Sequence, residues 1–178
     1  MIQLTDTQLQ VSLRALRDVI APALKDSASH VVEQTHLVIA TLEFAKQRLP
    51  HTRRFYREEL RYFIAYGLEV AALIGDNNSS LADDIREKCQ QGEEELQSPE
   101  ADVEDYLLVN RRLRELISAA VDHAAGGPEE AALNRLVLDR LKGYLPYQRA
   151  WLLPFGLDPS PGGLPPVDQV DALNIPRT

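Results

Sequence analysis

Apolar residues recur every three or four positions along most of this chain, and this helical spacing is the feature that most constrains its fold. Proline, glycine and serine signals divide the pattern into six segments between residues 5 and 146. No run of alternating β-branched residues, the pattern that predicts a strand, interrupts them. We therefore predict an all-α fold, an up-and-down antiparallel bundle of about six helices joined by short loops.

Local start and stop signals place the individual helices. The first is expected to begin at a capping box, Thr5 to Gln8, and to kink or end at Pro22. The other expected helices run from Ser27 or Ser29 to Pro50, over 52–74, from Ser79 or Ser80 to Leu96, from the start signal Ser98-Pro99-Glu100 to Gly126, and from Pro128 to Pro146, where the proline is expected to break the last helix.

The composition changes at Pro154. Residues 154–178 contain six prolines and three glycines in 25 positions, which excludes a helix. Apolar residues such as Phe155 and Leu173 recur there, and in a purely solvated tail they would bury no surface. We predict a helical bundle domain over 1–153. The Pro/Gly-rich tail over 154–178 is either an extended strap, docked on its own chain or a neighbour, or disordered.

The charge balance narrows the classes of partner. The formal net charge is −8, which argues against a general nucleic-acid or anionic-membrane surface. The best candidate for a local basic patch is Arg111, Arg112 and Arg114, which we interpret as a solvated helix face because acidic residues lie close by. No apolar stretch approaches the roughly 20 residues of a membrane span, and the first ten residues lack a signal-peptide pattern. The single cysteine, Cys89, supports no disulfide framework. We expect a cytoplasmic protein with no nucleic-acid or membrane partner.

Motifs that usually accompany catalysis do not appear in the sequence. There is no Gly-rich phosphate loop, no Gly-x-Ser-x-Gly elbow and no Cys–His arrangement. Adjacent acids such as Glu58 and Glu59 point about 100° apart on a helix, so we interpret them as solvated faces. We expect no cofactor, and the question of an enzyme stays open, with a non-enzyme favoured.

The segment SHVVEQTHLV contains His30, Glu33 and His36, and Glu-x-x-His is a spacing that dimetal bundles use. On a helical wheel these side chains point away from the apolar stripe that includes Val31 and Leu42. No second Glu-x-x-His occurs. We expect an ordinary polar helix face, and a metal site formed by these three residues remains the alternative.

The helix expected over 52–74 is apolar on two faces. The second face is defined by Phe55, Tyr62, Tyr66 and Leu73. Such a helix is either buried between neighbours or offers one face to a partner. Glu69 lies among these residues and would need a tyrosine hydroxyl or an arginine as its partner.

Two readings of this helix carry functional hypotheses. In the first, the aromatic face is the interface of a homodimer or of a complex with another protein. In the second, the protein is a helical bundle that binds a small molecule or an acyl group, or a minor enzyme. Its site would then lie near Glu69, Tyr66 and His123. Arg53, Arg54 and Arg57 at the helix start either meet an acidic partner or pair with Glu58 and neighbouring helices.

Residues 13–50, with the segment Val19-Ile20-Ala21-Pro22-Ala23-Leu24, resemble the opening of a family of small helical bacterial proteins of unassigned function. Members of that family are found beside aminoglycoside-phosphotransferase-like kinases and acyl-CoA dehydrogenases in hydroxyacyl-CoA catabolism. At least one is thought to be an accessory subunit of such a kinase. The resemblance implies a non-enzymatic accessory protein that partners such a kinase or dehydrogenase, and it carries over no catalytic residue.

Overall fold

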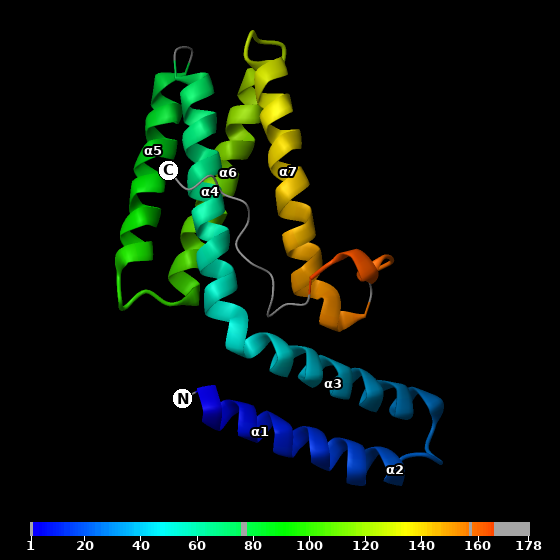
Figure 1. The fold of residues 1–178 in the computed structure, drawn as a ribbon. Helices are drawn as coiled ribbons and strands as arrows, with labels where there is room; N and C mark the ends of the chain where they lie inside the picture. Colours follow the sequence, from blue (N-terminus) through cyan, green and yellow to red (C-terminus); the bar gives the residue numbers. More distant parts are fainter. Residues whose placement is uncertain (1, 76–77, 157, 166–178) are drawn as a thin grey trace. The chain divides into compact units, whose positions relative to one another are not determined.

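The computed structural model describes residues 2–75, 78–156 and 158–165, and these residues form helices and connecting turns without a strand (Figure 1). The prediction of an all-α fold is confirmed. The helices are α1 (Ile2–Ala15), α2 (Ala21–Ala23), α3 (Ser29–Arg48), α4 (Thr52–Ile74), α5 (Ser79–Gln97), α6 (Val103–Ala124) and α7 (Glu130–Leu152). A π-helical turn, Leu16–Ile20, joins α1 to α2, and 3-10 turns occupy Leu49–His51, Leu153–Phe155 and Pro161–Gly163.

The chain is organised in two compact units. The first contains the chain up to Thr52 and the stretch that begins at Arg149, so it includes the hairpin of α1 and α3. The second contains Arg53–Gln148, in which α4, α5, α6 and α7 lie side by side as a bundle with short connections (Figure 1). The boundary falls within α7. The strap predicted for the tail lies largely outside the described residues, which end at residue 165.

All four helices of the bundle contribute to one hydrophobic core. Its largest fully buried side chains are Leu60 and Val70 on α4, Ile85 and Cys89 on α5, Tyr106 and Leu113 on α6, and Leu133 on α7. Because every helix buries part of one apolar face in this core, the second unit has the packing that a stable bundle needs.

Two glycines let α4 and α5 approach closely. A Cβ at Gly67 would lie 2.9 Å from the Sγ of Cys89, and one at Gly92 would lie 2.8 Å from the Cδ1 of Ile64. Real Cβ atoms do not tolerate such distances, so the side chains of both neighbours fill the space that glycine leaves. The Cys89 thiol also donates to the carbonyl of Ile64 at 3.5 Å.

One predicted helix start and one predicted cap are wrong, in both cases because a different residue provides the cap. The helix expected from Ser98 begins at Val103, since Asp102 accepts from the backbone N–H groups of the first turn and forms a capping box with Asp105. Ser98 instead ends α5, and its N–H donates to the carbonyl of Glu94. The cap of α5 is Asn78 rather than Ser79 or Ser80.

The first helix also differs from its prediction. It begins at Ile2, before the supposed capping box at Thr5. Pro22 lies in the final helical turn, as expected, and the helix ends at Ala23. Just ahead of it, the N–H of Ala21 donates to Leu16 in a π-helical turn. A proline has no N–H for the normal ladder, and a wider turn is one way for the backbone to adjust.

The prediction that Pro146 breaks the last helix is wrong. α7 continues through Pro146 to Leu152. Side chains on both sides of the proline are fixed to α4: Tyr144 and Gln148 bind Glu59, and Tyr147 donates to the carbonyl of Phe55 at 2.8 Å. This tertiary anchoring offsets the lost backbone hydrogen bond.

Candidate functional site

A network of hydrogen-bonded polar side chains in the bundle is centred on Glu59. This residue is only 3% exposed. The interpretation of Glu59 as part of a solvated face is therefore wrong. Its Oε1 accepts from Arg114 Nη2 at 2.8 Å, the Tyr144 hydroxyl at 2.6 Å and Gln148 Nε2 at 2.7 Å. Its Oε2 accepts from Asn110 Nδ2 at 3.2 Å. The carboxylate thereby links α4 to α6 and α7.

The surroundings of this carboxylate favour a structural role. The Arg114 guanidinium lies 4.5 Å from the ring centre of Phe63 and supplies the compensating charge. The hydroxyl of Tyr144 donates to Glu59 and accepts from Gln148 at 2.8 Å. Burial raises the pKa of Tyr144, and the hydrogen bond to Glu59 raises it further. The tyrosine is thus kept protonated as a donor.

The aromatic face of α4 lies inside the bundle. Phe55, Tyr62 and Tyr66 are all buried, whereas Leu73 is partly exposed. Phe55 stacks on Tyr147 with ring centres 4.5 Å apart, and the Tyr62 hydroxyl donates to the backbone carbonyl of Arg140 at 2.7 Å. Of the two alternatives, the structure shows a central helix, so the three aromatic residues are not available as an exposed interface.

Burial also changes the titration of these side chains. It raises the pKa of Tyr62 to about 12 and also raises the pKa of Tyr66. The thiol of Cys89 has its pKa raised to about 12 by burial, with a smaller contribution from Glu93. These groups therefore stay protonated at neutral pH, and the protonated Cys89 thiol is a poor nucleophile.

Glu69 has the arginine partner that the sequence required. The Arg140 guanidinium binds both carboxylate oxygens of Glu69, and its Nε lies 3.1 Å from Oε2. The Glu69 side chain is 47% exposed, so this ion pair lies at the surface. His123 is exposed in the last turn of α6, and Tyr66 is buried.

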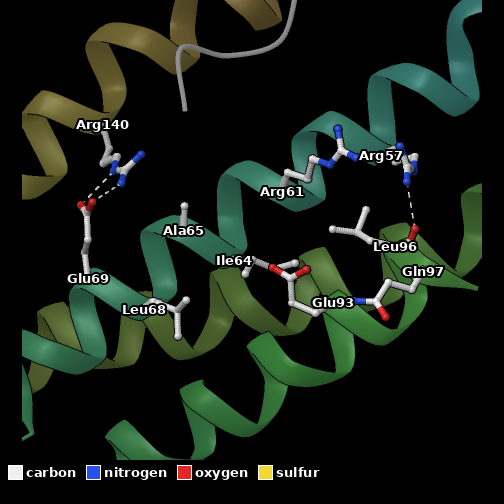
Figure 2. A pocket seen from close by; sticks show the side chains of 10 residues that line it. All are labelled: Arg57, Arg61, Ile64, Ala65, Leu68, Glu69, Glu93, Leu96, Gln97 and Arg140. Carbon is white, nitrogen blue, oxygen red and sulfur yellow. Dashed lines mark hydrogen bonds and ion pairs between the residues drawn. The ribbon is translucent and has the colours of Figure 1, made fainter. Parts of the chain in front are cut away.

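Glu69 and Arg140 border a pocket of about 450 Å³ (Figure 2). Its lining residues are Arg57, Arg61, Ile64, Ala65, Leu68, Glu69, Glu93, Leu96, Gln97 and Arg140. Figure 2 shows the Glu69–Arg140 pair at one end and Arg57 at the other. Neither Tyr66 nor His123 lines this pocket, so it does not unite the three residues of the predicted ligand site.

The arginines at the start of α4 bind the chain itself. Arg53 donates to the carbonyl of Ala101 at 2.9 Å, and Arg57 donates to the carbonyl of Leu96 at 2.9 Å. The Leu96 carbonyl is in the last turn of α5, where carbonyls have no partner within the helix. Arg53 and Arg57 therefore stabilise the α5–α6 connection. Glu58 pairs with a different arginine, Arg61.

The candidate metal ligands His30, Glu33 and His36 are all exposed on α3. Across residues 2–75, 78–156 and 158–165, no group of three or more His, Cys, Asp or Glu side chains is placed to hold a metal ion. These three side chains thus lie on a solvent-exposed part of α3.

The first unit buries few apolar side chains. Among its described residues, the buried hydrophobic ones are Leu13, Ile39, Ala150 and Trp151. Arg48 covers the Trp151 ring at 3.9 Å. The exposed large hydrophobic residues of this unit are Val11, Val19, Ile20, Leu37, Val38, Leu152 and Phe155. Sequence reasoning missed this surface because it assigned the helical stripes of the hairpin to a six-helix core.

Comparison with models of known protein families, with curated proteins and with solved structures finds no match to the chain. No helix in the described part of the chain combines the length and the apolar character needed to cross a membrane.

Proposed function

We propose that this chain is a non-enzymatic helical interaction or accessory protein, and that the surface of its α1–α3 hairpin binds a protein partner. The observation that carries the proposal is the small core of the first unit. Among the hairpin side chains whose burial the structure describes, the buried hydrophobic ones are Leu13 and Ile39, while Val11, Val19 and Leu37 are exposed.

Helices in water depend on tertiary packing, because intrinsic propensity alone leaves them marginally stable. Burying one Val or Leu side chain contributes about 1.5–3 kcal/mol. A hairpin that leaves aliphatic side chains such as Val19, Leu37 and Val38 exposed forgoes part of that stabilisation. A partner surface that covers them would supply it, which is the reason to assign the hairpin to binding.

The resemblance over residues 13–50 falls on this same hairpin, and it makes an acyl-CoA catabolic kinase or dehydrogenase the first candidate partner. A second copy of the chain is the other candidate. Asn110, Arg114 and Tyr144 all donate to the Glu59 carboxylate, which supports a scaffold role for the bundle. The proposal includes a cytoplasmic setting, where the buried thiol of Cys89 stays reduced.

Light scattering coupled to size-exclusion chromatography tests the proposal. The full chain is measured alone and mixed with the kinase and the dehydrogenase encoded nearest to its gene. We expect a dimer or a complex that Leu37→Asp with Val38→Asp abolishes. The matched control is Leu108→Asp, an exposed leucine on α6 of the other unit. A monomer that binds neither enzyme, or a complex that survives the double substitution, would contradict the proposal.

A second candidate function is binding of a small apolar or acyl ligand. It rests on a pocket of about 510 Å³ in the first unit, lined by Phe44, Leu152, Phe155 and Pro159 beside the Arg149–Asp158 ion pair. Pockets of this size and apolar lining are typical of ligand sites. Trp151 is the only tryptophan of the chain. Titration with decanoate should change its fluorescence if the pocket binds acyl chains, and Phe44→Ala should weaken that response.

A further inference from the structure

Helix α7 has a second apolar face that points away from the bundle. Leu138, Leu141 and Leu145 are 61%, 40% and 53% exposed, respectively. On a wheel of 100° per residue they lie within about 60° of one another. On the same wheel Arg140 and Tyr144, which reach α4, lie about 130° and about 90° from the middle of the stripe. The bundle therefore does not cover these leucines.

The spacing of the three leucines is that of a coiled-coil seam. Steps of three and four residues place them at successive a, d and a positions of a heptad, where leucine fits between the side chains of a facing helix. A narrow seam of this kind suits a second helix better than it suits a broad apolar surface. The occupant is thus expected to be an amphipathic helix with its own apolar seam.

The charges beside the seam decide which helix fits. Arg135 and Lys142 occupy the two e positions, and the g positions are the uncharged Val137 and Tyr144. In an antiparallel pair of two α7 helices, the basic e positions would face each other. In a parallel pair they would find no acidic partner. A second copy of α7 is therefore disfavoured, and acidic flanking residues are favoured.

One acidic residue of α7 already pairs with a basic residue beside the seam. Asp139 pairs with Lys142 at 2.7 Å, and both side chains are mostly exposed. Hydrogen bonding from Lys142 lowers the pKa of Asp139, with a smaller contribution from Arg135. An exposed pair of this kind is weak and exchangeable, so Lys142 can turn to a carboxylate on a docked helix.

We propose that the outer face of α7 is a docking site for an acidic amphipathic helix of a protein partner. The site uses residues other than those of the α1–α3 surface, and it stands if the function proposed for that surface fails. The same leucines and basic residues could contact an anionic lipid surface. The narrow seam of three leucines favours the helix, because a membrane surface would need a broader apolar face.

The test uses the full chain and two labelled peptides of about 21 residues, a length of three heptads. Both carry leucine at a and d, and one has glutamate at e and g where the other has lysine. By fluorescence anisotropy we expect the glutamate peptide to bind at least about tenfold more tightly than the lysine peptide. Leu141→Asp should weaken binding by about tenfold or more, and Leu108→Asp should not.

Charge reversal gives a second variant that keeps the leucines. Arg135→Glu with Lys142→Glu should invert the preference, so that the lysine peptide binds more tightly. Urea unfolding followed by circular dichroism checks that each variant folds. Failure of the glutamate peptide to bind at millimolar concentration, equal binding of both peptides, or insensitivity to Leu141→Asp overturns the proposal. Binding only to phosphatidylserine vesicles, lost in Leu141→Asp, also overturns it and assigns the face to a membrane.

Discussion

At the scale of single residues, Glu59 is the buried carboxylate on which hydrogen bonds from both α6 and α7 converge. Glu59→Ala should remove the common acceptor of Arg114, Tyr144 and Gln148 and leave these donors without it. We expect a loss of about 3 kcal/mol in unfolding free energy, since Arg114 is half exposed and can turn to water. Urea denaturation measures it.

A matched control for this substitution is Glu115→Ala. Glu115 is also on a helix and paired with an arginine, Arg112, but both side chains are mostly exposed. Its loss should change the unfolding free energy by no more than about 0.5 kcal/mol. Equal effects of the two substitutions would show that the network around Glu59 adds nothing beyond a surface pair.

The burial of Glu59 could have been anticipated from the sequence. It lies four residues after Phe55 and four before Phe63, so it shares a helix face with two buried aromatic rings. The neighbouring Glu58 led to the interpretation of a solvated pair. The identity of the donors could not be predicted, because they come from α6 and α7 and depend on the packing register of three helices.

The buried tyrosines make a prediction about alkaline pH. Burial raises the pKa of Tyr62 from 10.0 to about 12. The unfolded chain thus loses this proton near pH 10 while the folded chain keeps it. Stability present below pH 10 is lost between pH 10 and about 12, by about 1.4 kcal/mol per pH unit for this group.

Unfolding free energies measured in urea at successive pH values test this dependence. Tyr62→Phe removes one titrating group and should flatten the decline above pH 10. At neutral pH it should cost about 1 kcal/mol, through the lost hydrogen bond to the Arg140 carbonyl. An identical pH slope for the variant and the natural chain would refute the assignment.

At the scale of elements, the true start of α6 can be tested against the predicted one. Asp102→Ala removes the capping box and should lower the unfolding free energy by about 1 kcal/mol. Ser98→Ala, at the start that the sequence suggested, should change it little, because Ser98 contributes its backbone N–H to α5. Thermal unfolding of the two variants measures both effects. A larger loss of stability for Ser98→Ala than for Asp102→Ala would support the helix start predicted at Ser98.

The existence of a helix was predictable where the apolar spacing agreed with a strong helix-stop residue in the sequence. The helix over 52–74 has the predicted bounds, since Pro50 and Gly75 flank a long amphipathic segment. Ends were less predictable where two local signals competed or where tertiary contacts intervened. Asp102 caps α6 in place of Ser98, and contacts with α4 carry α7 past Pro146. A proline in the sequence indicates the local free-energy cost of a lost backbone hydrogen bond. It does not indicate the tertiary packing that can offset this cost.

At the scale of the whole molecule, the division into two units was not visible in the sequence. Residues 1–52 and the later helices share the same apolar spacing, and spacing does not tell how much of a stripe is covered. Burial distinguishes them: in the hairpin Leu13 and Ile39 are covered, whereas in α4 the buried residues run from Phe55 to Ile74. Core size is a property of packing between elements, so only the structure reveals it.

This difference predicts how fragments of the chain will behave. A fragment of residues 53–148 keeps the core of the bundle and the Glu59 network, including Gln148. It should be helical and should unfold cooperatively in urea. A fragment of residues 1–52 should have little helix, because few of the apolar side chains described in this hairpin are buried, and it lacks the packing to offset its conformational entropy.

Circular dichroism with urea titration on each fragment and on the full chain makes the comparison. If residues 1–52 alone were as helical as in the full chain, the exposed aliphatic side chains would need no cover, and the argument for a partner at the hairpin would fail. If residues 53–148 lost cooperative unfolding, the bundle would depend on the first unit. The combination expected here, a stable bundle beside a hairpin that cannot fold alone, is typical of a protein that completes its structure by binding.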